Sequence, residues 1–179
     1  MTTLASPVLA AAPIDAAHPH YRWISLAMFA GGFATFSMLY SVQALMPLFA
    51  QTFHLSAAVA SMTLSASSLT LALCMIPAGI LSDRIGRKPL MLFSLVGSSF
   101  LTLLGSVSPG LETLILSRAL LGVTLAGLPA VAMAYLSEEL EPVALAKALG
   151  LYIAGNALGG MCGRFASAWL AEHAGWRMA

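Results

Sequence analysis

The chain has 179 residues, of which 59% are hydrophobic and only 8% are charged, and its formal net charge is +1. A mean hydropathy of +0.89 is more than a soluble domain of this size can bury, because most residues of a small domain touch water. The near-neutral charge gives no reason to expect a nucleic-acid partner. Apolar runs of about 20 residues match the thickness of a bilayer core, whereas β-barrels use short alternating segments. Composition therefore predicts an all-α membrane protein.

The first 21 residues differ from the rest of the chain. They are rich in alanine and proline and contain no lysine or arginine. A secretory signal peptide begins with positive charge, so we expect a disordered tail here. Two histidines in it, His18 and His20, are too few for a good metal site, and no metal is expected.

Five apolar stretches follow, and each is long enough to cross a bilayer. They cover about residues 23–49, 57–81, 89–107, 111–136 and 143–171. Residues suited to helix ends separate them: Ser56 as an N-cap, Gly86 and Pro89 around a charged loop, and Pro142 as a first helical residue. The chain is thus divided into a tail, 1–21, and an incomplete membrane domain of about five helices, 22–179.

Lysine and arginine set the orientation, because cytoplasmic loops carry an excess of them. The opposite side holds only Arg177. On the side of the tail lie Arg22, Arg84, Arg87, Lys88 and Lys147. We therefore predict a cytoplasmic N-terminus and an outside position for the last residue.

The loop after the second stretch concentrates the charge. It reads Gly79-Ile80-Leu81-Ser82-Asp83-Arg84-Ile85-Gly86-Arg87-Lys88. Asp83 and Arg87 are four residues apart, so they would pair on one side of a helix end. Arg84, Arg87 and Lys88 alone would suffice to orient the protein in the membrane. Asp83 reduces the positive charge of the loop, so orientation alone does not explain it. The pattern resembles the loop signature of the major facilitator superfamily of transporters, with Ser82 in place of the usual alanine.

The resemblance implies a fold and a role for this loop. The fold would be most of one six-helix half of a twelve-span carrier. Gly79, Asp83, Arg84, Gly86 and Arg87 would form a latch that holds the two halves together in the outward-open state. Arg84 or Arg87 would pair with an acid at the end of the fourth span, either Glu138 or, second, Glu139.

The fourth stretch contains a charge within the membrane. Arg118 lies about 10 Å along the helix from Leu111, at 1.5 Å per residue. Such a residue usually faces a cavity or a partner, although it can also extend to the lipid headgroups. Residues 114–122 resemble a second family motif, whose arginine is implicated in proton coupling, but Leu121 replaces the glutamine often found there. Gly122, four residues after Arg118, starts a row of small residues suited to helix packing.

The fifth stretch carries two rows of residues at helical spacing. The first row, Gly155, Gly159 and Gly163, is suited to close helix packing. The second row is Asn156, Gly160 and Arg164. Packing alone does not explain the two polar residues of this row, and whether they line a substrate path stays open. Residues 155–160 resemble the family's antiporter motif, but Asn156 replaces its proline, which leaves antiport open. In an incomplete half, both small-residue rows would lose some of their partners.

One polar residue of the first stretch is also a candidate. Residues 41–47 resemble the end of the first helix in bacterial efflux permeases. Gln43 would then face the central cavity, or it is an ordinary residue of the membrane interface.

The function follows from these resemblances. No nucleophile, metal cluster or phosphate-binding loop is found, and Cys74 and Cys162 fit small buried apolar residues, so neither enzyme activity nor a cofactor is expected. The resemblance implies the N-terminal part of a bacterial inner-membrane carrier for drugs or sugars, with efflux coupled to protons. It would be inactive without the missing C-terminal half. The alternatives are a non-transporting interaction module of the membrane and a half-carrier that dimerises.

Overall fold

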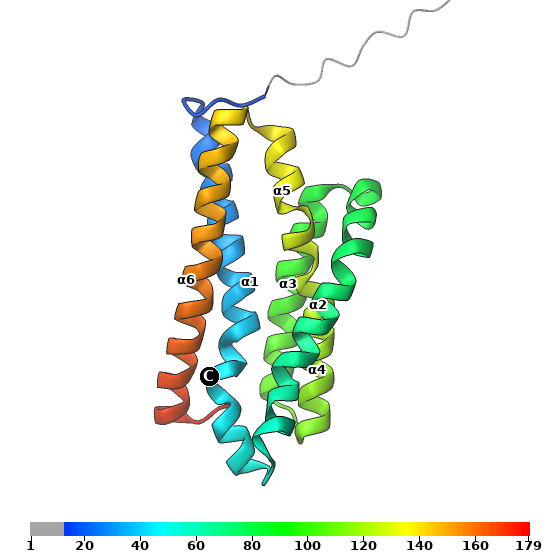
Figure 1. The fold of residues 1–179 in the computed structure, drawn as a ribbon, viewed down its shortest axis with the longest axis vertical. Coiled ribbons are helices and arrows are strands. Elements are labelled where there is room, and N and C mark those ends of the chain that lie inside the picture. The colour runs from blue at the N-terminus through cyan, green and yellow to red at the C-terminus, as the bar shows by residue number, and fades with distance from the viewer. Residues whose placement is uncertain (1–12) are drawn as a thin grey trace, which may run out of the picture.

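The structure, a computed structural model, describes residues 13–179 as helices joined by short loops (Figure 1). The helices are α1 (Pro19–Thr52), α2 (Ala57–Ile85), α3 (Arg87–Ser106), α4 (Leu111–Leu125), α5 (Gly127–Glu139) and α6 (Pro142–Ala174). Because α4 and α5 together form one stretch, five segments of the described part of the chain are long and apolar enough to cross a membrane. The predicted fold of about five membrane-spanning helices is therefore confirmed.

The helix ends follow the local chemistry of the sequence. Ser56 caps α2, with its hydroxyl accepting a hydrogen bond from the amide of Val59 at 3.4 Å. The turn between α2 and α3 is a single residue, Gly86, at φ 94°. Side chains other than glycine rarely adopt that conformation, so this residue allows the chain to turn between two helices without a loop.

The first helix starts earlier than the sequence indicated. The N-cap is His18, whose Nδ1 accepts a hydrogen bond from the amide of His20 at 3.2 Å, and Pro19 opens the helix. Proline is well suited to this place because it lacks an amide hydrogen that would go unpaired. Helix α1 therefore begins at Pro19, before the start of the first apolar stretch that was expected at about residue 23. Residues 13–18 are part of the described structure, whereas residues 1–12 of the expected tail lie outside it.

The fourth stretch, expected to be one helix over 111–136, is broken at Ala126 between α4 and α5. Pro129 has no amide hydrogen, so it cannot bond the carbonyl of Leu125 four residues before it. The hydroxyl of Ser94 on α3 donates to that carbonyl instead, at 3.3 Å. The break is thus stabilised by a neighbouring helix.

The helices form two groups in Figure 1. α1 and α6 run side by side in the same direction, and α2 and α3 pack against α4 and α5. Three glycines allow the first pairing, because Gly155, Gly159 and Gly163 lie against the backbone of α1. Gly122 lies in the same way against α2. The rows were expected to lose some of their partners, but these four glycines have partners in helices of the described chain itself.

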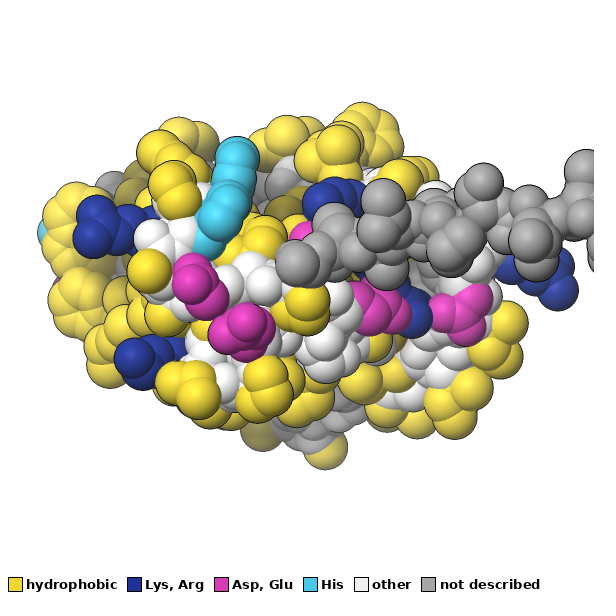
Figure 2. Space-filling model, turned by 90° about the horizontal axis from the view of Figure 1, so that it is seen from above, with side chains coloured by type: hydrophobic (Ala, Val, Ile, Leu, Met, Phe, Trp, Pro, Cys, Tyr) yellow, Lys and Arg dark blue, Asp and Glu magenta, His cyan; other side chains and the backbone are white. Residues whose placement is uncertain are grey.

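Large apolar side chains cover the outside of the bundle. Phe165 is 74% exposed and Ile76 is 75% exposed. Figure 2, which views the bundle from above, shows charged side chains spread across this end, with apolar side chains above and below them. Such a surface suits the hydrocarbon of a bilayer, where apolar exposure carries no cost.

Candidate functional site

The end of the bundle seen in Figure 2 carries a network centred on Arg87 at the start of α3. Its guanidinium contacts Asp83 of α2 at 2.8 Å and Glu138 of α5 at 2.9 Å. It also donates to the hydroxyl of Ser82, which in turn donates to the carbonyl of Gly79 at 2.6 Å. One side chain therefore joins three helices. We call this set, Ser82, Asp83, Arg87 and Glu138, the Arg87 network.

A second ion pair lies beside this network. Lys88 contacts Glu139 at 3.1 Å, and its ammonium lies 5.4 Å from the centre of the Tyr135 ring. Of the two acids considered as arginine partners, Glu138 binds Arg87 and Glu139 binds the lysine. Arg84 is exposed and forms no ion pair with the described residues.

The two glycines of this loop behave differently. Gly86 provides the turn conformation described above. At Gly79, by contrast, no atom lies within 4 Å of the place that a Cβ would occupy. A close approach of another helix at Gly79 is therefore not seen within the described part of the chain.

The segment before α1 holds the acidic loop in place. Ile14 donates its amide to the carbonyl of Glu139 at 2.8 Å and accepts from the amide of Glu141 at 3.1 Å. Its side chain packs on the core cluster that includes Leu140 and Ala144. Residues 13–18 thus cross the α5–α6 loop next to the Arg87 network.

Arg118 of α4 lies inside the bundle and is only 6% exposed. Its guanidinium donates to two adjacent carbonyls of α1, Met38 at 3.0 Å and Leu39 at 2.7 Å, and to the hydroxyl of Ser67 at 3.4 Å. A carbonyl oxygen has two lone pairs, so it can accept such a bond in addition to its helical one. Its Nε atom is buried and has no hydrogen-bond partner among residues 13–179. The side chain points to α1, not outward to headgroups.

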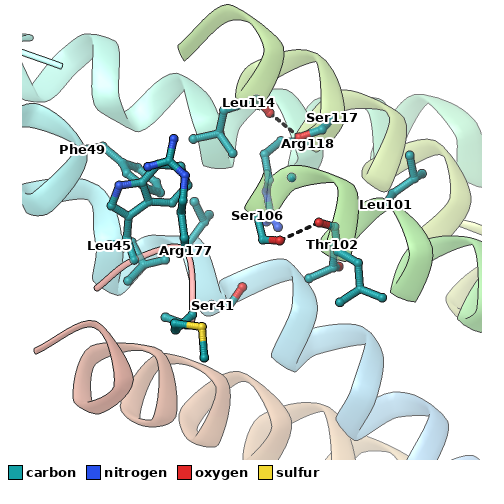
Figure 3. A pocket seen from close by; sticks show the side chains of 16 residues that line it. Ser41, Leu45, Phe49, Leu101, Thr102, Ser106, Leu114, Ser117, Arg118 and Arg177 are labelled. Carbon is teal, nitrogen blue, oxygen red and sulfur yellow. Dashed lines mark hydrogen bonds between the residues drawn. The ribbon is translucent and has the colours of Figure 1, made fainter. Parts of the chain in front are cut away.

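A cavity of about 320 Å³ lies beside Arg118 (Figure 3). Helices α1, α3 and α4 and the last residues of the chain line it. Its walls are mainly apolar, with Leu45, Phe49 and Leu114 among them. Arg177 at its rim lies over the Trp176 ring at 4.3 Å and donates to the carbonyl of Ser108 at 3.0 Å.

A second polar set lies where α1 and α6 meet. The guanidinium of Arg164 donates to the carbonyl of Gly160 at 2.8 Å and to the amide oxygen of Gln43 at 3.2 Å. It also lies 5.2 Å from the centre of the Tyr40 ring. The structure thus brings Gln43 and Arg164, chosen separately from the sequence, into contact.

Asn156 lies on the same helix, two turns before Arg164. Its amide oxygen is buried and has no partner among the described residues. It lies close to Gly32 of α1, where a Cβ would overlap it, and near the ring of Tyr152. Arg118, in contrast, contacts none of Gln43, Asn156 and Arg164, so the four path candidates form separate groups.

The described residues offer little for a metal. Within residues 13–179, no group of three or more His, Cys, Asp or Glu side chains is close enough to hold an ion. Cys74 and Cys162 are free thiols and partly buried.

Several contact residues were not found from the sequence. Ser82 was noted only as a departure from the family pattern, although its hydroxyl gives Arg87 an additional acceptor. The partners of Arg118 on α1 could not be found, because every residue has a backbone carbonyl and the residue type therefore does not identify them. Tyr40 could have been found, because its spacing from Gln43 places both on one face of a helix.

Comparisons with known proteins fit this geometry. A family model described as Major Facilitator Superfamily matches residues 24–179. The chain is 48% identical over 161 residues to the uncharacterized MFS-type transporter YybF of Bacillus subtilis (strain 168), covering 90% of the chain and 40% of the relative. It is 43% identical over 161 residues to the inner membrane transport protein YnfM of Escherichia coli (strain K12), covering 90% of the chain and 39% of the relative.

A more distant relative is the multidrug efflux pump LfrA of Mycolicibacterium smegmatis. The identity is 34% over 106 residues, which cover 59% of the chain and 21% of the relative. The chain spans about 40% of the length of YybF and YnfM.

Proposed function

This chain belongs to the major facilitator superfamily, and from that premise we propose that it forms the N-terminal part of a twelve-span secondary carrier. The carrier moves a small molecule across the membrane by alternating access, and proton-driven efflux of drugs or sugars is the proposed direction. The transporter names of the relatives and the five apolar helices support a membrane transport protein. The name of the efflux pump LfrA supports the export direction.

The observation that carries this proposal is a set of polar side chains on α1 and α6, which we call the polar row: Gln43, Asn156 and Arg164. Gln43 and Arg164 contact each other within helices that are mainly apolar, and both are exposed. Polar groups within a membrane span usually face a cavity or a water-filled path. We therefore assign Gln43, Asn156 and Arg164 to the substrate path, at the surface where the second half of the carrier would close.

We assign a latch role to the Arg87 network. Ion pairs at a helix end can be made and broken as two rigid halves rock, because each pair is partly solvated and weak on its own. Asp83 and the unpaired Arg84 are exposed at this end, where they are free to contact the other half. Gly86 holds the turn, and open space at Gly79 leaves room for a helix of that half.

Arg118 is proposed to act in coupling. The guanidinium of Arg118 links α4 to α1 by hydrogen bonds to two carbonyls of α1, with no carboxylate involved. A change in the surroundings of this charge therefore moves both helices together. The orientation is proposed from the lysine and arginine bias, with the N-terminus in the cytoplasm of a bacterium.

The test is flux through the carrier of full family length. In inverted membrane vesicles, imposing an inward-acid proton gradient should drive uptake of ethidium or of a labelled sugar, and collapse of the gradient should stop it. Equal uptake by vesicles without the carrier would refute transport of those probes. Saturable flux by the 179-residue chain alone would instead show a half-carrier.

A further inference from the structure

The contact between Arg164 and Gln43 has an open side. A guanidinium carries five N–H donors. In Arg164, one donates to the carbonyl of Gly160 and one to the amide oxygen of Gln43. The other three have no acceptor among the described residues, and the side chain is exposed. One edge of the group is therefore available to a ligand.

The same contacts hold the group in a fixed orientation. The Nε atom is tied to its own helix, and the Tyr40 ring covers one face of the plane at 5.2 Å. Gly160 makes room for that ring, since a Cβ there would lie 3.1 Å from it. A guanidinium fixed in this way needs little reordering when it binds a planar partner, which favours affinity.

No carboxylate of the described chain neutralises this charge. Arg164 forms no ion pair with the described residues, whereas Arg87 and Lys88 do. The nearest acid along α6 is Glu172, eight residues later and so about 12 Å away along the axis. All seven acids lie in loops or near helix ends: Asp15, Asp83, Glu112, Glu138, Glu139, Glu141 and Glu172. The middle of the bundle is therefore positive.

Arg164 also differs from the other arginine within a span. Arg118 is buried and its guanidinium is held by two carbonyls and a hydroxyl. Both terminal nitrogens of this guanidinium therefore already donate to acceptors of the protein. Of these two arginines, Arg164 is the one that combines exposure, free donors and a fixed plane.

We infer that the substrate of this carrier is a small organic anion whose carboxylate binds the free edge of Arg164, beside the amide of Gln43. Two parallel N–H···O bonds are the usual geometry of an arginine with a carboxylate. This inference rests on the proposed transport function and deepens it by naming a substrate class. It requires the face of α1 and α6 to border the substrate path.

The experiment compares matched ligands on the full-length carrier in lipid nanodiscs. The probes are 2-naphthoate and 2-naphthamide, which share a ring system and differ in charge, and tetraphenylphosphonium as a cation. Binding is measured by calorimetry and by the ligand-induced rise in unfolding temperature. Saturable binding of naphthoate, at least about tenfold tighter than the amide, is expected because hydrogen bonds to charged groups are about twice as strong as neutral ones.

Variants then assign the binding to Arg164. Arg164→Gln should lower naphthoate affinity by about tenfold or more, and Arg164→Lys by less, because it keeps the charge but loses the planar fork. Arg22→Gln, at an exposed arginine near the start of α1, should change nothing. If Arg164→Gln fails to fold, Gln43→Leu serves as the second variant, with a several-fold loss.

Three outcomes would overturn the inference: equal binding of acid and amide, binding of the cation only, or naphthoate binding that survives Arg164→Gln. An acid elsewhere in the full-length carrier that paired with Arg164 would also make naphthoate binding independent of Arg164, and it would overturn the inference in the same way. Flux is measured separately in proteoliposomes. A carrier that binds naphthoate but moves no probe contradicts the transport function alone, and one that moves only cations contradicts the anion site alone.

Discussion

At the scale of single residues, Arg87 is the clearest case of a side chain with several partners, and these form the Arg87 network. It connects α2, α3 and α5 through Asp83, Ser82 and Glu138. It also lies far from the polar row of α1 and α6. Arg164 is 22 residues from the start of α6, and this corresponds to about 33 Å. The two regions can therefore be tested independently.

We expect Asp83→Asn and Glu138→Gln in the full-length carrier to lower the maximal transport rate several-fold and to leave KM within about twofold. The reason is that each change removes an ion pair of the latch and none touches the substrate path. Substrate-dependent flux in proteoliposomes measures both constants.

The matched control is Glu141→Gln, because Glu141 is exposed three residues after Glu138, between α5 and α6, and its side chain forms no ion pair with the described residues. Its rate should equal that of the unmodified carrier. A normal rate for Glu138→Gln, or an equal loss for Glu141→Gln, would argue against the latch.

Arg118 should be intolerant even of lysine. We expect Arg118→Lys to reduce the transport rate at least about tenfold, because an ammonium cannot span two adjacent carbonyls as the planar guanidinium does. Arg22→Lys, at an exposed position, should be nearly neutral in the same flux assay. Similar small effects of both changes would mean that the buried contacts of Arg118 are not needed.

Sequence reasoning reached part of this detail. The four-residue spacing of Asp83 and Arg87 predicted their pairing on one helix end. The two residues do pair, but across the Gly86 turn, with Asp83 in α2 and Arg87 in α3. The contact of Arg118 with Met38 and Leu39 was beyond reach, because backbone carbonyls are the same at every position. The burial of the Asn156 amide oxygen against Gly32 could not be inferred either, since it depends on how α1 lies against α6.

At the scale of elements, the glycines of α6 determine how close α1 can come. Gly163 is near the backbone of Ser37, at 2.6 Å from the position of an added Cβ. Ser37 also donates to the carbonyl of Gly159 at 2.9 Å, which joins the two helices directly. Close packing of this kind is the main attraction between helices in lipid.

We expect Gly159→Ala to destabilise the carrier by about 1–3 kcal/mol, because the new methyl group would overlap the backbone at Phe33. The matched control is Gly150→Ala on the same helix, where nothing lies within 4 Å of an added Cβ. It should be neutral or stabilising by up to about 1 kcal/mol, since alanine favours helix. Thermal unfolding in detergent compares the two, and equal stability would contradict close packing at Gly159.

Hydropathy placed all five spans, because length and apolar composition suffice for that. It missed the ends by up to four residues, where polar caps extend the helices beyond the apolar run. It also missed the break at Ala126, although Gly127 and Pro129 are signals for one. These two residues lie within a long apolar run, which favoured a single helix. The hydroxyl of Ser94, which bonds the carbonyl that Pro129 leaves free, comes from another helix.

At the scale of the whole molecule, the lysine and arginine bias gives a topology that the structure makes testable. Ala17 and Thr52 flank α1 at its two ends, and both are exposed. Gly86 is less suitable for labelling, because its φ of 94° would strain a cysteine.

We expect Ala17→Cys to react with a membrane-impermeant maleimide only after cells are permeabilised, and Thr52→Cys to react in intact cells. Both variants need Cys74 and Cys162 replaced by serine, so that the background is free of thiols. The reverse labelling pattern would invert the orientation and place the Arg87 network outside.

Expression of the 179-residue chain alone tests how far this part is self-sufficient. Its glycine rows are filled by its own helices, so we expect it to insert and to keep the pairing of α1 with α6. The exposed Arg164 and Gln43 would then face lipid, and a charged side chain at such depth costs about 2.5–3.5 kcal/mol. The chain should avoid that cost by self-association and should carry no flux. Light scattering in detergent should therefore show oligomers that Arg164→Leu reduces, with Arg22→Leu as the control, and a monomer with saturable flux would instead support a self-sufficient half-carrier.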